Sequence, residues 1–213
     1  MLLNQKPQNR DFIVSQSPWE HLIQSDFLDM DDFNLLTSLI DYDPDCNKTI
    51  QCAKKPIGEH KFKNFNGPKN PTDAVFKELP KSKELLELLS MVEIKLLDNL
   101  KLLGGDYLGG RETQAIDVQV QTLIQDKKID LHCDALSKIL STIVYTDSTD
   151  YGTFISDNCY NHIDECVEVD SIPNSALSFI SIKDKTWHGY LSKNINSVIK
   201  PRTTFNFFIR GSF

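Results

Sequence analysis

Period-two patterning dominates the second half of the chain and most limits the folds available to it. Apolar residues alternate from Val118 to Ile124, and runs rich in β-branched and aromatic residues cover 139–145, 176–182 and 203–209. Turns rich in Asp, Asn and Gly separate these runs. Short strands that follow helical segments are typical of an antiparallel sandwich or open barrel with helices on one side. We therefore expect a mainly β fold with flanking helices.

The first half of the chain carries two helix signals after a short predicted strand at 18–23. Asp29 and the acidic residues after it are typical of a helix N-terminus, because carboxylates there cap free amides and oppose the helix dipole. Between Ser82 and Leu103 apolar residues recur every three or four positions, and Gly104–Gly105 ends the pattern. This apolar face favours packing on the protein's own sheet, with a dimer seam as the alternative.

Residues 43–80 show no period and are rich in Lys, Asn, Pro and Gly. Between Asn47 and Pro71 there are six lysines and one acidic residue, Glu59, in a chain that is acidic overall. Long aperiodic segments inside compact domains are usually surface inserts or functional loops. We therefore expect a loop insert here, which is either a solvated surface or a loop that attracts an anionic substrate.

Charge and composition exclude several classes of partner. The 23 basic and 30 acidic residues give a net charge of −7, which argues against nucleic acid because nucleic-acid affinity depends on neutralised phosphates. No apolar run approaches the roughly 20 residues of a membrane span, and the start of the chain lacks an apolar signal core. Five cysteines, an odd number, suit a reducing compartment. The 213 residues thus predict one cytoplasmic domain without a membrane partner.

Two His-x-Asp triplets are the first candidates for metal chemistry. His132 and Asp134 come between two strand-like runs, and residues i and i+2 of an extended segment point the same way, so both side chains can converge on one ion. His162 and Asp164 follow a polar, turn-like stretch. We therefore expect the first triplet to bind metal and the second to lie in a surface loop.

Further along the chain lie a third ligand and a basic anchor. His188 follows the run 176–182, and Arg202 begins the next strand, where Arg202, Thr204 and Asn206 share one face. Two His and one carboxylate form the facial triad that leaves positions open on Fe(II). An Arg one strand away offers a planar fork to a carboxylate. Together these residues predict a metal site with an anchor for an anionic co-substrate.

The order His-x-Asp, His, Arg resembles that of the Fe(II)- and 2-oxoglutarate-dependent dioxygenases, in particular their prolyl-4-hydroxylase-like branch. Five further segments resemble sequence patterns of that branch, and so, more weakly, does the stretch 18–28. These segments are His132–Ser141 ("HTDxxxKxxS"), Tyr151–Phe154 ("GGTxF"), Ile172–Phe179 ("PNxxxxF"), Trp187–Gly189 ("WHG") and Arg202–Asn206 ("RxTxN"). The resemblance is strongest over residues 116–210.

The resemblance implies a fold, a cofactor and a reaction. The fold is a double-stranded β-helix (jelly-roll or cupin-like) core at 116–210, within a single domain 1–213 in which 18–110 supplies helical support and the loop insert. His132, Asp134 and His188 would hold Fe(II), and Arg202 with Thr204 would grip 2-oxoglutarate. With O2, the enzyme would hydroxylate a C–H bond of a peptide or small molecule and release succinate and CO2.

The sequence also departs from the family patterns in three places. Cys133 stands between the two ligands where Thr is commoner, and we expect it to point away from the metal. Tyr151 replaces one Gly of the "GGTxF" pattern. The first strand lacks the Tyr that many members direct at the co-substrate, and Tyr145 is the candidate in its place.

The same sequence features allow other interpretations. The chain could be a catalytically silent cupin-like binding protein, or a zinc hydrolase that uses the same triad and would not need Arg202. A separate zinc cluster at Cys159, His162 and Cys166, with Asp164, fits no common spacing. A disulfide between Cys46 and Cys52 is disfavoured in a reducing compartment. His21 and His60 are expected to be hydrogen-bonded or solvated, and the oligomeric state stays open, with a dimer possible.

Overall fold

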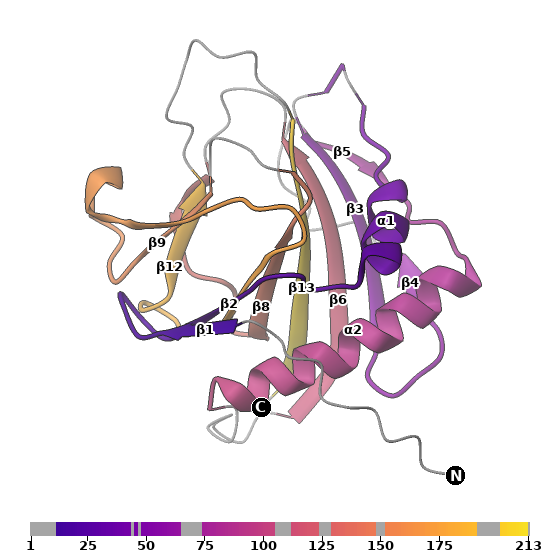
Figure 1. Ribbon diagram of the computed structural model, residues 1–213, viewed down its shortest axis with the longest axis horizontal. Coiled ribbons are helices and arrows are strands. Elements are labelled where there is room, and N and C mark those ends of the chain that lie inside the picture. Colours follow the sequence, from indigo (N-terminus) through magenta and orange to yellow (C-terminus); the bar gives the residue numbers. More distant parts are fainter. Residues whose placement is uncertain are drawn as a thin grey trace.

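Figure 1 shows the computed structural model of the protein. It describes the residues 12–43, 45–46, 48–64, 74–104, 112–123, 129–147, 152–190 and 201–212. Four features singled out above, namely Ile124, Gly105, Tyr151 and residues 65–73 of the basic segment, lie outside these ranges. No helix in the described ranges is both long enough and apolar enough to cross a membrane.

The described chain folds into two mainly antiparallel sheets. The strands of the larger sheet are β1 (Phe12–Ser15), β2 (His21–Gln24), β3 (Lys48–Pro56), β4 (Lys63–Asn64), β5 (Ala74–Lys77), β6 (Glu112–Leu123), β8 (Lys138–Tyr145), β11 (Ala176–Ile180) and β13 (Arg202–Ser212). Their order is β1–β2–β11–β8–β13–β6–β3–β4, and β5 pairs in parallel with β3. The predicted strands at 139–145, 176–182 and 203–209 are thus confirmed as β8, β11 and β13.

The smaller sheet lies beside the larger one, as the positions of β9 and β12 in Figure 1 show. Its strands are β7 (Ile129–His132), β9 (Thr153–Ser156), β10 (Val167–Val169) and β12 (Trp187–Tyr190), and a short 3₁₀ helix, η2, covers Ile163–Glu165. The strand order is β10–β9–β12–β7. The two sheets enclose a common cavity, because residues of both line it.

Two α-helices form where the sequence predicts them. In α1 (Met30–Ser38) the N-cap residue Asp29 accepts a hydrogen bond from the backbone N–H of Asp32. In α2 (Lys83–Leu102) Ser82 accepts one from Leu85 at 3.0 Å. Gly104 follows α2 with φ +73°, a left-handed conformation that glycine adopts without strain and that ends the helix. Both helix predictions are confirmed.

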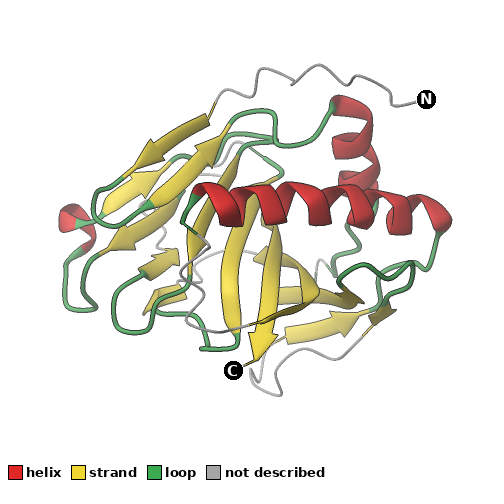
Figure 2. Ribbon diagram, turned by 90° about the horizontal axis from the view of Figure 1, so that it is seen from below, coloured by secondary structure: helices red, strands yellow, loops and turns green. Residues whose placement is uncertain are grey.

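Both helices cover the same side of the larger sheet (Figure 2). The apolar face of α2, which includes Leu85, Val92 and Leu96, is buried in the main hydrophobic core together with Phe205 and Phe207 of β13. The helix therefore packs on its own sheet, as the spacing of its apolar residues favours. A mainly β fold with flanking helices is confirmed.

The expectation of a loop insert at 43–80 is wrong for its described part. Strand β3 contributes nine residues next to β6, and most of its side chains are buried. The lysines of β3 made this segment resemble a polar loop, so the sequence did not predict the strand. Lys55 is one of them, and it is buried against Glu93 of α2 in an ion pair. A charged residue with a buried partner can occupy a core position that its type alone does not predict.

The Lys55–Glu93 ion pair yields a stability prediction. Glu93 also accepts a hydrogen bond from the backbone N–H of Gly58 at 2.9 Å, so the pair ties β3 and the turn after it to α2. Lys55→Met leaves the Glu93 carboxylate without its cation, and we expect the free energy of unfolding to fall by about 3–5 kcal/mol. The double variant Lys55→Met/Glu93→Met removes both charges and should recover most of that loss. Urea denaturation of the wild type and the two variants measures both effects, and a double variant no more stable than Lys55→Met would contradict the coupling.

Candidate metal centre

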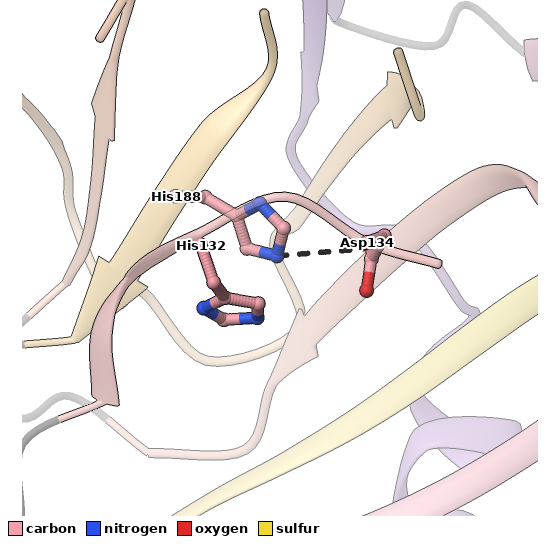
Figure 3. Close-up of side chains that lie close together, drawn as sticks. All are labelled: His132, Asp134 and His188. Atoms are coloured by element: carbon pink, nitrogen blue, oxygen red, sulfur yellow. Dashed lines mark ion pairs between the residues drawn. The ribbon is translucent and has the colours of Figure 1, made fainter. Parts of the chain in front are cut away.

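His132, Asp134 and His188 come together at one point between the sheets. His132 ends β7, Asp134 lies in the loop that follows, and His188 in β12 pairs directly with His132 in the sheet register. One possible ligand atom from each lies within 4.8 Å of the others, and within the described ranges no other His, Cys, Asp and Glu residues gather in this way. Figure 3 shows the three side chains converging, with the contact from His188 to Asp134 drawn as a dashed line.

Backbone hydrogen bonds set the tautomer of both imidazoles. The Nδ1 of His132 lies 2.9 Å from the carbonyl oxygen of Asp130, and the Nδ1 of His188 lies 3.1 Å from that of Thr186. A carbonyl can only accept, so each Nδ1 carries the hydrogen and each Nε2 keeps a lone pair. This outer hydrogen bond is the one that metal-binding histidines usually make.

The protonation state of His188 also suits a metal ligand. Burial lowers its pKa to about 4, although Asp134, with its Oδ2 3.7 Å from the His188 Nε2, works in the opposite direction. The buried imidazole is therefore neutral at neutral pH, and no proton competes with a cation for its Nε2. His188 is the middle residue of the "WHG" segment, and the structure brings it next to His132 and Asp134 as the sequence predicts.

Asp134 is held by two neighbours. Lys138 donates to its Oδ1 and Ser141 donates to its Oδ2. Burial raises the pKa of Asp134, but interactions with His188 and Lys138 and the two hydrogen bonds outweigh it, so the pKa stays below its usual value. The carboxylate is consequently ionised and fixed in orientation before any ligand arrives.

Arg202 is a buried cation that has no carboxylate partner among the described residues. It begins β13 and is 6% exposed, and its Nη2 donates to the hydroxyl of Thr153 at 3.1 Å. The guanidinium carbon lies 4.4 Å from the ring centre of Tyr190 and 5.7 Å from that of Tyr145. Its Nε has no hydrogen-bond partner, and in the described chain it forms no ion pair. A buried charge in this condition is expected to receive an anion.

The metal centre and Arg202 open into one cavity of about 220 Å³. Thr204, Asn206 and Phe208 of the same strand also line it, which confirms that alternate residues of this strand face the same way. Tyr145 is buried and is not among the lining residues; its hydroxyl donates to Thr153 at 2.7 Å. This placement makes Tyr145 a positioning residue for Arg202 and Thr153, and its direct contact with a co-substrate stays a prediction.

The remaining candidate ligands lie apart from the centre. His162 is exposed beside η2, as expected for a surface loop, and none of the described cysteines, Cys46 and Cys52 included, forms a disulfide. His21 is buried, and its Nδ1 donates to the carbonyl of Trp19, while His60 is exposed. Burial raises the pKa of the Cys133 thiol, which lies against backbone amides of residues 184–186 and outside the ligand cluster.

Sequence reasoning missed four residues that complete the site. Thr153 and Tyr190 contact Arg202, and Lys138 and Ser141 hold Asp134. Lys138, Ser141 and Thr153 fall inside segments that resemble family patterns, so a signal for them was present. No pattern marks Tyr190, because its contact with Arg202 depends on how β12 and β13 meet in space.

Comparisons with known proteins agree on the fold. The structure is similar to a prolyl-4-hydroxylase from Pseudomonas putida, at 12% identity over 91% of this chain and 93% of the other, with a TM-score of 0.52. It is also similar to an oxidoreductase of the 2OG-Fe(II) oxygenase family from Burkholderia pseudomallei, at 14% identity over 89% and 84% of the two chains and a TM-score of 0.50. OsALKBH1 matches at 15% identity over 89% and 97%, with a TM-score of 0.50.

These likenesses show that the chain has the jelly-roll fold of the 2OG-Fe(II) oxygenases, which confirms the expected fold class. No protein-family model matches the sequence, and no curated protein matches it significantly. At such low identity the fold is shared, and the chemistry must be argued from the site itself.

The lowered pKa of His188 predicts how the metal-free protein responds to acid. The unfolded chain binds a proton at the ordinary histidine pKa of about 6.5, whereas the folded chain resists protonation down to about 4. Folding stability from this residue is therefore complete above pH 6.5 and is lost as the pH falls to 4, by about 3 kcal/mol. Urea denaturation with a chelator present should show this loss in the wild type and in His162→Asn. An equally large loss in His188→Asn would contradict it.

Proposed function

We propose that this protein is an Fe(II)- and 2-oxoglutarate-dependent dioxygenase that hydroxylates a C–H bond of a small molecule or peptide and releases succinate and CO2. One observation carries the proposal: a His-Asp-His cluster with free Nε2 lone pairs and an unpaired, buried Arg202 face the same cavity. The fold shared with the 2OG-Fe(II) oxygenases supports it.

The three ligand side chains fit a divalent iron ion. Two imidazoles and a carboxylate on one side of an ion form the facial triad and leave the other positions open to the cavity. When bound, Fe(II) with 2-oxoglutarate and O2 supplies the oxidising chemistry that no side chain provides. The chain holds His132 and His188 by their Nδ1 hydrogen bonds and Asp134 by Lys138 and Ser141, so the geometry is set beforehand.

Arg202 fits the far carboxylate of a dicarboxylic co-substrate. Its planar fork can donate two parallel hydrogen bonds, and its burial strengthens them. Thr153 already accepts hydrogen bonds from Arg202 and Tyr145, so its own hydroxyl hydrogen remains for a ligand oxygen. Thr204 lines the cavity beside Arg202 and can add another.

The apolar lining separates the reacting centre from water. Ile129, Ile143 and Phe208 line the cavity between the polar groups, and Ile143 and Phe208 are largely buried. Such a lining keeps a reactive oxidant away from side reactions. The small volume of the cavity and the acidic net charge favour a small molecule or a peptide over a nucleic acid as substrate. A cytoplasmic location belongs to the same proposal and is supported by the free thiols.

Iron binding should depend on the first His-x-Asp triplet and not on the second. Under anaerobic conditions, titration with Fe(II) and 2-oxoglutarate should produce a weak visible charge-transfer band that requires both. His132→Ala should weaken iron binding by more than about 100-fold, beyond what loss of an outer-shell partner costs. His162→Ala is the matched control and should bind like the wild type. Failure of the wild type to bind iron would refute the proposal, and binding without succinate release would leave a silent binding protein.

Affinity for 2-oxoglutarate should depend on the fork of Arg202. Arg202→Ala leaves the ligand carboxylate unpaired in a buried site, and we expect a loss of about 30- to 5000-fold. Arg202→Lys keeps the charge but loses the planar geometry, so its affinity should lie between the two. Titration of 2-oxoglutarate into the iron-loaded wild type, Arg202→Ala and Arg202→Lys measures the three affinities. Equal affinities in wild type and Arg202→Ala would place the co-substrate elsewhere.

A further inference from the structure

Three carboxamide side chains form a polar cluster on the cavity wall, away from the metal ligands. Gln119 and Gln121 lie on β6, and Asn206 lies on β13. Gln119 pairs directly with Asn206 in the sheet register, and Gln121 pairs with Thr204, so the three amides face the same side of neighbouring strands. All three line the cavity. We call these three residues the amide cluster.

The amide cluster leaves hydrogen-bonding capacity unused. Gln121 is 8% exposed, and its Oε1 accepts a weak hydrogen bond from the Nε2 of Gln119 at 3.5 Å. That contact orients the Gln121 amide so that its own Nε2 is the free end, and this buried Nε2 has no partner. Asn206 is similarly buried, and its side chain makes no hydrogen bond within the described ranges.

Unpaired donors are concentrated at this cavity. Five buried side-chain atoms in the described chain lack a hydrogen-bond partner, and three of them are oxygens of Asn64, Asn99 and Asp117. The other two are donors, the Nε2 of Gln121 and the Nε of Arg202, and both residues line the cavity. A buried donor without an acceptor carries its full desolvation cost, so such atoms point to an absent ligand that accepts.

The alternative is that the amide of Gln121 serves only the fold. Gln51 shows the hydrogen bonds that such a structural amide makes in this protein. Gln51 of β3 is also buried, but its oxygen accepts from the backbone N–H of Asp41 at 3.0 Å and its nitrogen donates to the carbonyl of Glu78. Both ends of that amide bind the protein itself. The Gln121 amide has a single weak contact inside the cluster and therefore does not stabilise the fold in the same way.

The amide cluster lies on a different wall from the groups that meet Arg202. Arg202 extends from β13 to Thr153 and Tyr190 of the smaller sheet. The two glutamines lie on β6, on the side of β13 opposite to β8, which carries the Asp134 partner Ser141. Arg202 and Thr204 of β13 are assigned to the co-substrate, whereas the neighbouring side chains of Gln119 and Gln121 come from β6 and are assigned no role toward it.

We propose that the amide cluster binds a carbonyl or carboxylate oxygen of the substrate that is oxidised, with Gln121 as the specificity-determining donor. This inference rests on the proposed function, and it specifies the chemistry of the substrate: an oxygen acceptor close to the C–H bond that reacts. Lys48 also lines this cavity and adds positive charge to it, which favours a carboxylate over a neutral carbonyl.

Thermal stability separates a ligand-binding amide from a structural one. Gln121→Leu replaces an unpaired buried amide with an apolar group of similar size, so the melting temperature should stay the same or rise. Gln51→Leu is the matched control on the neighbouring strand, and it breaks two hydrogen bonds, so its melting temperature should fall. A fall of several degrees in Gln121→Leu, equal to that in Gln51→Leu, would assign Gln121 to the fold and overturn the proposal.

Binding of simple probes tests the acceptor directly. N-acetylglycine offers a carboxylate and a carbonyl, and N-acetylglycinamide offers only neutral carbonyls. Each is titrated into anaerobic protein loaded with Fe(II) and 2-oxoglutarate, and the apparent affinity is taken from the shift in melting temperature. We expect the acid to bind more tightly than the amide and its affinity to fall about three- to tenfold in Gln121→Leu. Gln114→Leu, at an exposed position of β6, is the control and should match the wild type.

The results of the binding experiment distinguish failure of this inference from failure of the proposed function on which it rests. Tighter binding of the neutral amide would keep the acceptor but identify a carbonyl as the group bound. Equal affinities in wild type and Gln121→Leu, or no binding of either probe, would overturn the inference while the iron and 2-oxoglutarate band stays intact. Absence of that band in the wild type would instead refute the proposed function.

Discussion

Strand β13 is the element on which the rest of the structure depends, because its alternation separates the hydrophobic core from the cavity. Phe205 and Phe207 point to the core beneath α2, while Arg202, Thr204 and Asn206 line the cavity. A shift of one residue in register would exchange the two sets. The pairing of β13 with β6 on one side and β8 on the other holds that register. Stability and site chemistry are therefore coupled through a single strand.

Asp134 and Arg202, two charged residues that line the cavity, differ in how far the protein satisfies their hydrogen-bonding groups. Asp134 receives hydrogen bonds from Lys138 and Ser141, so its carboxylate is ionised and oriented in the absence of metal. Arg202 has one hydroxyl and two aromatic rings around it and keeps an unpaired Nε. The protein thus satisfies the carboxylate that we propose to hold a cation and leaves the buried guanidinium with an unpaired donor. This asymmetry is what a site for a metal and an acidic co-substrate requires.

The sequence predicted the strands β2, β6, β8, β11 and β13, both helices and the three residues that converge at the candidate metal centre, and it failed where local pattern and tertiary environment disagree. The sequence identified His132, Asp134 and His188 because each belongs to a recognisable segment. In addition, residues i and i+2 of an extended chain face the same way. Strand β3 was missed because Lys55, which reads as a surface residue, is neutralised by Glu93 on a distant helix. The hydrogen bond from Tyr145 to Thr153 and the approach of its ring to Arg202 were not predicted either, because both contacts join different strands.

The sequence by itself determined the alternation of the strands, the capped ends of the helices, and which residue types meet at the candidate metal centre and at the start of β13. These properties are local, since each depends on side-chain type and on spacing within one segment. Only the tertiary structure decided which polar groups find partners. Gln51 and Gln121 are the same residue type on adjacent strands, yet the first is hydrogen-bonded at both ends of its amide and the second has a free donor at the cavity. Whether a buried group is satisfied depends on atoms that lie far away in sequence, and no local pattern encodes them.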